Sequence, residues 1–455
     1  MRATLTVLLA VTLIAGSAAA KIALPAAEEV TLDNGLTVQI VERHDLPLFS
    51  LQMTFRAGSI NDPVGSEGLA NLSSEMLMRG TKTRSAKDIA DEIAFGGGSL
   101  GDFCGRVSAG FSGEFLTAQG ENAFEILADL ILNSSVTEDE LDRTRSRILG
   151  EIRSGKENAQ AVAGDGIFEA ILGSSRYAHP TEGTEETVEP LDRDAVVRFI
   201  KDFYTPDNCV LVVCGDIDKT SVLGWIEKQF GSWKGKHNPV CDETSFPEVE
   251  GKSVVIYDKE DATQTQIRIG GNGLSLTSLD WPAIDVARTI YGGSFTSRLM
   301  DEIRVNRGLT YSVRCNTSEY LPGGLVYVST FTRNDAVGEV VDVILEEALA
   351  MQNELVPDSE HVGGINYRCG LYPLRFETND DIAGVYSNMW LYGLDKSHYE
   401  DYQEKLREVT PEQTKALAEK YFARDNYRLV LVGKADEIKE QAEKFGPVTV
   451  ISLSN

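Results

Sequence analysis

Apolar and polar residues alternate near the start of the chain in a pattern that predicts paired strands. Residues 30–32 and 36–41 are apolar-rich and flank residues 33–35 (DNG), a sequence suited to a type I′ hairpin turn. Residues 49–55 place large apolar side chains at every second position, as a strand with one buried face does. The chain is therefore expected to open with a β-hairpin and a third strand.

Helical periodicity with capping signals follows these strands. Ser85 and Asp88 are expected to cap one helix, and Thr137 with Glu140 to form a capping box for another. The second half of the chain alternates strands and helices in a similar order. Strands are expected over 254–257, 265–269 and 325–332, and helices over 280–291 and 336–353.

A weak repeat divides the chain into two halves. Residues 203–218 (FYTPDNCVLVVCGDID) match residues 421–436 (YFARDNYRLVLVGKAD) at a constant offset of 218, and both blocks have the pattern of helix end, turn and buried strand. A polar stretch with Pro and Gly, residues 234–251, is expected to be a linker. The repeat predicts an α+β fold of two similar lobes, residues 21–233 and 252–455, each an antiparallel-rich sheet packed with helices.

Residues 1–20 have the pattern of a cleavable signal peptide. Arg2 precedes an apolar stretch that ends in Ala18-Ala19-Ala20, a small-residue cleavage site. The apolar stretch is shorter than the 18 or so residues that cross a bilayer, and no later segment is long enough. The chain is therefore expected to be exported, to the bacterial periplasm or beyond.

Composition and charge exclude several functions. The 455 residues carry 43 Lys and Arg against 70 Asp and Glu, a net charge of −27 that becomes −28 without Arg2. This charge, with no basic run to offset it, argues against nucleic-acid binding. The six cysteines include no C-x-x-C, and Cys209 and Cys214 lie too far apart along one expected strand to bond to each other. Buried thiols are expected.

The sequence lacks the usual local signature of a helical zinc site. Helical zinc motifs place two histidines four residues apart, whereas the closest of the five histidines here, His361 and His398, are 37 residues apart. Any catalytic role therefore has to rest on a longer-range pattern.

One such pattern lies in the first half of the chain. Residues 68–81 (GLANLSSEMLMRGT) resemble the active-site helix of the pitrilysin/insulinase family of inverted-zincin metallopeptidases, G-x-A-H-x-x-E-H-M-x-F-x-G-T. Residues 148–153 (ILGEIR) resemble the segment that supplies the family's third zinc ligand. The resemblance implies a metallopeptidase-like fold of two lobes, forming half of a peptidase clamshell.

The metal-binding positions of this family are altered here. Asn71 and Glu75 stand where the family has two histidines, and Ser74 stands where it has the glutamate base. Asn is a poor zinc ligand, and Ser has no carboxylate to accept a proton from zinc-bound water. Glu151 keeps the third position. No metal is expected in this chain. Glu75 and Glu151 are expected to be ordinary charges on helix faces, and the alternative is that they form a weak site for a hard cation.

A second stretch keeps the family pattern. Residues 292–299 and 302–313 resemble the family's glycine loop and its Arg-x-x-x-Tyr element, here Arg307 and Tyr311. The resemblance implies that these two side chains bind the substrate carbonyl, since Arg and Tyr can donate to it as an oxyanion forms. The plainer interpretation is a surface ion pair and a strand tyrosine. The loop residues are Gly292, Gly293 and Ser294.

The edge strand that family members offer to a peptide is also altered. Residues 96–98 (GGG) either end a helix or precede this edge, but residues 100–104 (LGDFC) depart from the family's Asn-Ala-x-Thr sequence. The peptide-pairing role of this edge is therefore left open.

The resemblance implies a pseudoenzyme subunit that acts in proteolysis. We expect an exported, zinc-free, substrate-binding chain that forms a heterodimer with a homologous zinc-bearing peptidase subunit, so that zinc lies in the partner and peptides are the substrates. One alternative is a catalytically inactive periplasmic peptide-binding or scaffold protein of the same fold. Another is an autonomous peptidase with a rebuilt metal site. Substrate specificity and homodimer formation are not indicated by the sequence.

Overall fold

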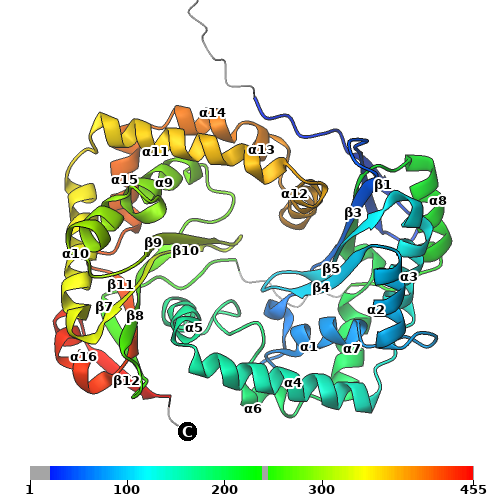
Figure 1. Cartoon of the computed structure of the whole chain (residues 1–455), viewed down its shortest axis with the longest axis horizontal. Helices are drawn as coiled ribbons and strands as arrows, with labels where there is room; N and C mark the ends of the chain where they lie inside the picture. Colours follow the sequence, from blue (N-terminus) through cyan, green and yellow to red (C-terminus); the bar gives the residue numbers. More distant parts are fainter. Residues whose placement is uncertain (1–20, 238–243, 454–455) are drawn as a thin grey trace, which may run out of the picture.

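The structure, a computed structural model, describes residues 21–237 and 244–453. The predicted signal peptide, Cys241 and the centre of the predicted linker lie outside the described residues. Figure 1 shows two lobes that face each other, one built mainly from each half of the chain.

Each lobe contains a six-stranded mixed sheet, with strand order β1-β2-β6-β3-β5-β4 in the first and β12-β7-β11-β8-β10-β9 in the second. Most neighbours are antiparallel. The pairs β2–β6, β11–β7 and β12–β7 are parallel. The first sheet comprises β1 (Glu28–Thr31), β2 (Thr37–Glu42), β3 (Leu48–Phe55), β4 (Ser99–Cys104), β5 (Ala109–Leu116) and β6 (Cys209–Gly215). The second comprises β7 (Lys252–Asp258), β8 (Gln264–Gly273), β9 (Val313–Glu319), β10 (Gly324–Arg333), β11 (Tyr427–Gly433) and β12 (Val448–Ser452).

Helices occupy most of the remaining chain. Those of the first half are α1 (Leu69–Leu77), α2 (Ala86–Phe95), α3 (Gly120–Leu132), α4 (Glu138–Glu157), α5 (Ala159–Leu172), α6 (Glu185–Val188), α7 (Arg193–Phe203) and α8 (Lys219–Phe230). Those of the second half are α9 (Trp281–Arg288), α10 (Val337–Asn353), α11 (Asp358–Leu371), α12 (Asn379–Tyr392), α13 (Ser397–Glu400), α14 (Tyr402–Arg407), α15 (Pro411–Tyr421) and α16 (Ala435–Ala442).

The two halves repeat the same elements at the spacing that the sequence predicts. Helices α7 and α15 begin at residues 193 and 411, and strands β6 and β11 begin at 209 and 427, which is an offset of 218 in both cases. The pair α4–α5 is matched by α11–α12 at nearly the same offset. The predicted α+β class and the duplication are confirmed.

Each lobe also receives a helix from the other half. Helix α12 packs on β3 and β6 of the first sheet, where Ile382 and Tyr386 share a core with Val212. Helix α5 packs on β8 and β11 of the second sheet, where Phe168 shares a core with Val430. Both helices lie between the sheets in Figure 1. This exchange joins the lobes through apolar contacts.

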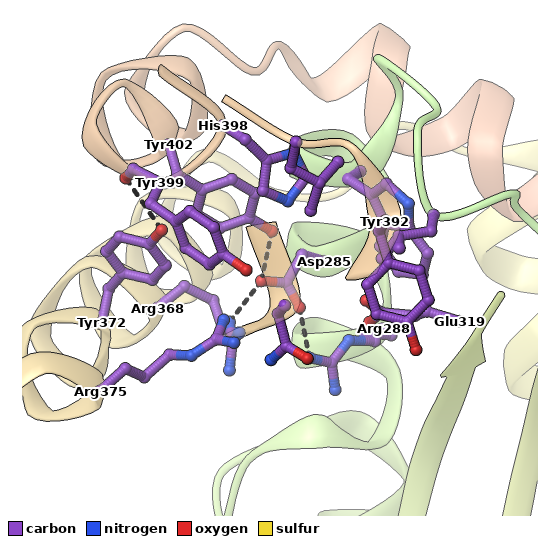
Figure 2. Close-up of a pocket in the computed structure, with 14 residues that line it drawn as sticks. Asp285, Arg288, Glu319, Arg368, Tyr372, Arg375, Tyr392, His398, Tyr399 and Tyr402 are labelled. Carbon is purple, nitrogen blue, oxygen red and sulfur yellow. Dashed lines mark hydrogen bonds and ion pairs between the residues drawn. The ribbon is translucent and has the colours of Figure 1, made fainter. Parts of the chain in front are cut away.

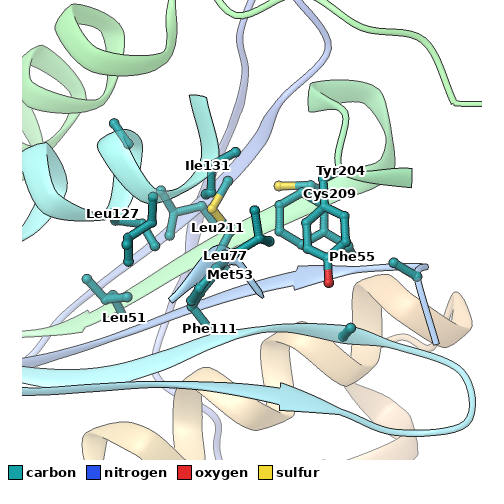
Figure 3. Close-up of a cluster of buried hydrophobic side chains, with 14 of the residues drawn as sticks. Leu51, Met53, Phe55, Leu77, Phe111, Leu127, Ile131, Tyr204, Cys209 and Leu211 are labelled. Carbon is teal, nitrogen blue, oxygen red and sulfur yellow. The ribbon is translucent and has the colours of Figure 1, made fainter. Parts of the chain in front are cut away.

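The exchanged helix α12 also explains one wrong prediction. Strand β3 does not have a single buried face, because Ser50 and Thr54 are as buried as its apolar residues. Its apolar side contributes Met53 and Phe55 to the main core of the first lobe, where Leu77 of α1 and Leu211 of β6 also lie (Figure 3). Helix α12 covers the opposite face, a contact across more than three hundred residues that strand periodicity cannot reveal.

The opening hairpin forms, but its turn is of a different type. A type I′ turn needs positive φ at both central residues, and the described chain has no positive φ outside glycine. Instead the Gly35 amide donates to the Leu32 carbonyl at 2.9 Å, and Gly35 itself has φ of 96°. This is a type I turn around Asp33 and Asn34 followed by a glycine bulge. The predicted turn type is therefore wrong.

The predicted helix caps are largely found. Ser85 and Asp88 form a complete capping box at the start of α2. Thr137 caps α4 by accepting from the Glu140 amide at 3.4 Å, and the described contacts do not include the return bond from the Glu140 carboxylate. Cys209 and Cys214 are buried free thiols of β6, as expected.

Candidate functional site

Helix α1 begins at a fixed point in the first lobe. Gly68, just before it, has φ of 99°, and a Cβ there would lie 2.5 Å from the Glu182 carbonyl oxygen. The Asp62 carboxylate accepts from the Gly68 amide at 2.8 Å and from the Ala70 amide at 2.7 Å. Burial raises the pKa of Asp62 to about 7. Together with the apolar side of α1 in the core, these contacts set which residues the helix presents outward.

The outward side of α1 carries Asn71 and Glu75, four residues apart. The Asn71 side-chain amide donates to Glu75 Oε1 at 3.4 Å, and Arg79, one turn further on, donates to Glu75 Oε2 at 3.3 Å. The Glu75 side chain is only 15 % exposed. A nearly buried carboxylate therefore lies at this position with polar partners around it.

The main partner of this carboxylate is an arginine of α4 that sequence reasoning missed. The Arg147 guanidinium forms an ion pair with Glu75 and donates through Nη1 to Glu151 Oε1 at 2.6 Å. One guanidinium thus joins Glu75 and Glu151, which are 76 residues apart in the sequence. The available signal was the spacing of Arg147 and Glu151, since residues four apart on a helix lie side by side.

Ser74 lies on the inner side of α1, against the edge strand of the first sheet. It is fully buried, and its hydroxyl donates to the Phe103 carbonyl at 3.3 Å. Nearby Asp102 of β4 was also missed by sequence reasoning. Burial raises the pKa of the Asp102 carboxyl, and its hydrogen bond with Ser74 acts in the opposite direction. A carboxylate of the edge strand therefore lies beside the serine, although α1 itself has none at position 74.

Strand β4 ends the first sheet. It pairs with β5 from Ser99 to Cys104, and its other edge has no strand partner among the described residues. Residues 100–104 are thus an edge strand despite their unusual sequence. Such an edge can accept an added peptide strand through main-chain hydrogen bonds.

Arg307 and Tyr311 lie in the second lobe. Arg307 ends the π-helical turn Met300–Asn306 and faces two carboxylates, Glu339 at 3.4 Å and Glu302 at 3.8 Å. Tyr311 precedes β9 and is 74 % exposed, with the Arg304 guanidinium 4.9 Å from its ring centre. Between the described residues, no hydrogen bond or ion pair joins this pair to Glu75 or Glu151. Arg304 is a further residue that sequence reasoning missed.

The glycine loop packs tightly against neighbouring backbone in the second lobe. The π-helical turn Thr289–Gly293 continues α9, and a Cβ on Gly292 would lie 2.9 Å from the Cys315 amide of β9. Gly293 is similarly crowded, with the Arg288 carbonyl 3.0 Å from the site of a Cβ. Ser294 follows in extended backbone. Glycine is required here for close approach of two backbones.

Two family models match the chain along most of its length. Residues 39–185 match the insulinase (peptidase M16) model, and residues 190–366 match the peptidase M16 inactive domain. The chain belongs to the M16 (insulinase) peptidase family. The predicted resemblance is therefore confirmed.

Relatives and solved structures agree with M16 membership. The uncharacterised zinc protease YmxG of Bacillus subtilis (strain 168) is 25 % identical over 403 residues, covering 88 % of this chain and 97 % of its own. An uncharacterised zinc protease of Rickettsia bellii is 26 % identical over 330 residues, covering 72 % and 79 %. An M16 inactive domain from Pseudomonas fluorescens superposes with a TM-score of 0.83 at 24 % identity, covering 90 % of this chain and 98 % of that one. A protease from Helicobacter pylori superposes with a TM-score of 0.83 at 18 % sequence identity, covering 90 % of this chain and 100 % of that one.

The zinc that the M16 family implies does not suit the residues present. Asn71, Glu75 and Glu151 offer one amide and two carboxylates, without imidazole or thiolate, and the Arg147 guanidinium is already paired with both carboxylates. Within residues 21–237 and 244–453, no three or more His, Cys, Asp or Glu side chains are grouped so as to hold a metal ion. An arginine in this place disfavours a divalent cation by direct charge repulsion.

One further finding concerns membranes. Across the described parts of the chain, every helix is too short or too polar to cross a bilayer. The predicted signal peptide lies outside these parts, so its role stays a prediction.

Proposed function

We propose that this chain is the zinc-free, substrate-binding subunit of an exported heterodimeric zinc peptidase that degrades peptides. The observation that carries the proposal is the Arg147 guanidinium between Glu75 and Glu151. It supplies a fixed positive charge at the position where active M16 sites need a metal. An arginine cannot activate water as zinc does, so hydrolysis would belong to another chain.

The second lobe supports a role in substrate binding. Tyr311 is exposed and lies four residues after Arg307, and both side chains are hydrogen-bond donors of the kind that stabilise an oxyanion. In the proposed heterodimer they would contact a peptide carbonyl held at the zinc of the homologous partner. The edge of β4 would supply main-chain groups to the same peptide.

Export forms part of the proposal. The first twenty residues carry the signal-peptide pattern. The two lobes of this chain would face the two lobes of the partner and enclose the peptide.

Reconstitution tests the proposal. The mature chain, residues 21–455, is mixed with an M16 chain from the same genome that has an intact H-x-x-E-H, and cleavage of a fluorogenic peptide is followed. We expect the mixture to exceed the partner alone, and Tyr311→Phe to lower kcat/KM about 100-fold, as loss of an oxyanion donor does. Arg307→Ala should act in the same direction.

Matched controls separate a site effect from a surface effect. Tyr367→Phe and Arg424→Ala change an exposed tyrosine and an exposed arginine outside this element and should leave kcat/KM unchanged. A mixture no faster than the partner alone, or full activity in Tyr311→Phe and Arg307→Ala, would overturn the proposal. Stoichiometric zinc in the purified chain would instead support an autonomous peptidase.

A second candidate function is a periplasmic peptide-binding or scaffold protein that takes no part in catalysis. The ion pairs of Arg307 with Glu339 and Glu302 favour it, because they occupy a guanidinium that a catalytic subunit would direct at substrate. A genome without any H-x-x-E-H-bearing M16 chain would decide for this function.

A further inference from the structure

A polar cavity lies in the second lobe, away from both the α1 site and Arg307. Its volume is about 250 Å³, and Figure 2 shows its lining side chains. It is walled by α9, the end of β9 and the helical layer from α11 to α14, including Tyr392 of the exchanged helix α12. Ligand pockets start at about 300 Å³, so this one suits a small molecule rather than a long peptide.

The floor of the cavity is a cluster of one carboxylate and two guanidinium groups, with a net charge of +1. Asp285 is 2 % exposed and forms ion pairs with Arg288 and, at 2.7 Å, with Arg368. It also accepts from the Tyr402 hydroxyl at 2.9 Å. A buried carboxylate with these partners is satisfied. This cluster is therefore a rigid base, and recognition would fall to the other side chains.

Two charged side chains of the wall lack such partners. Within the described residues, the Glu319 carboxylate forms no hydrogen bond or ion pair, and the guanidinium of Arg375 has only the ring of Tyr372, 5.7 Å from its centre. Burial raises the pKa of Glu319, and the guanidinium of Arg288, followed by those of Arg375 and Arg368, acts in the opposite direction. They enter the cavity from opposite sides in Figure 2.

Aromatic side chains also line the cavity. Among them are Trp281, Tyr392 and Tyr399, and aromatic faces attract an ammonium group. The wall thus offers a guanidinium and a carboxylate on opposite sides, together with aromatic surface.

We propose that this cavity binds a free dipeptide-sized zwitterion, with the ligand carboxylate at Arg375 and its ammonium group at Glu319. A simple anion would be attracted by Arg375 and the floor cluster but would leave the Glu319 carboxylate unpaired, and a simple cation would pair with Glu319 but be repelled by Arg375 and the floor. A zwitterion satisfies both charges at once. The site is separate from the proposed peptidase role, since the chain can be tested without a partner.

Calorimetric titration of the mature chain with Ala-Ala tests the site. We expect saturable binding with Kd at or below about 1 mM, and at least about tenfold weaker binding of N-acetyl-Ala-Ala and of Ala-Ala-amide. Each variant should lose its preference for Ala-Ala over only one of the two capped forms. Glu319→Gln should bind Ala-Ala and its N-acetyl form alike, and Arg375→Gln should bind Ala-Ala and its amide alike.

Arg424→Gln is the matched control, because it removes an exposed arginine of the same lobe that does not line the cavity. It should bind Ala-Ala as the native chain does, and circular dichroism with thermal unfolding confirms that all variants are folded. The proposal is overturned if Ala-Ala shows no saturable binding or if the capped forms bind as tightly as Ala-Ala. It is also overturned if Glu319→Gln and Arg375→Gln still bind Ala-Ala more tightly than both capped forms.

Discussion

Arg147→Ala is the sharpest perturbation of the α1 site. It removes the guanidinium that joins Glu75 to Glu151 and leaves Glu75 with Arg79, at 3.3 Å, and the Asn71 amide. Because Glu75 is largely shielded from water, its charge cannot recover full hydration when the guanidinium is lost. The helix pair α1–α4 should therefore be weakened.

The two ion pairs of Arg147 contribute different amounts to the free energy of unfolding. The pair with Glu151 is solvent-exposed, with side chains 41 % and 58 % exposed, and contributes at most about 1 kcal/mol. The pair with Glu75 is more buried, and breaking fully buried pairs costs about 3–5 kcal/mol. Since Arg79 remains beside Glu75, we expect a total loss of about 2 kcal/mol, which lowers Tm by about 4–8 °C for a unit of 150–250 residues.

Thermal unfolding followed by circular dichroism measures this loss. Arg143→Ala is the control, because Arg143 lies on the same helix and, among the described residues, pairs only with Glu140 in an exposed contact, so its removal should cost under about 1 kcal/mol. A double-mutant cycle with Glu75→Gln isolates the pair, with an expected coupling of about 1–2 kcal/mol.

Two results would refute this reasoning. One is an Arg147→Ala chain that unfolds at the same temperature as Arg143→Ala. The other is a cycle in which Glu75→Gln fails to restore any of the loss, since neutralising Glu75 removes the charge that Arg147 compensates.

Three further predictions concern the fold around the site. Burial raises the pKa of Asp62 to about 7, above its unfolded value, so it favours folding at low pH and this contribution is lost as pH rises from about 4 to 7. The native-minus-Asp62→Asn difference in unfolding free energy should therefore fall across that range, and a flat difference would contradict the assignment. Gly68→Ala should cost more than about 2 kcal/mol in urea unfolding, because of its positive φ and the approach to the Glu182 carbonyl. Ile382→Ala should cost about 2–5 kcal/mol and expose the first sheet to hydrogen exchange, and unchanged protection of β3 would show that α12 is not held by this side chain.

Local sequence signals predicted most individual elements. The Ser85 cap, the opening hairpin and the apolar runs of β6 and β11 depend on residues within a few positions of one another, and all are found. The type I′ turn was wrong because Asp33 and Asn34 take negative φ, a choice between turn types that a short sequence does not settle.

The site was harder to predict, because its key contact is long-range. Asn71, Ser74, Glu75 and Glu151 could be located from their motif positions alone. Which cation faces the two carboxylates depended on how α4 packs against α1, and this brought Arg147 between them.

The sequence by itself determined the family, the duplicated two-lobe fold and the absence of histidine ligands on α1, because motifs and periodicity are local properties of the chain. Only the tertiary structure decided that α5 and α12 cross between lobes, that Arg147 joins Glu75 to Glu151, and that Glu319 and Arg375 share a cavity. Such contacts join residues tens to hundreds of positions apart, and their geometry follows from the packing of whole elements rather than from any local pattern.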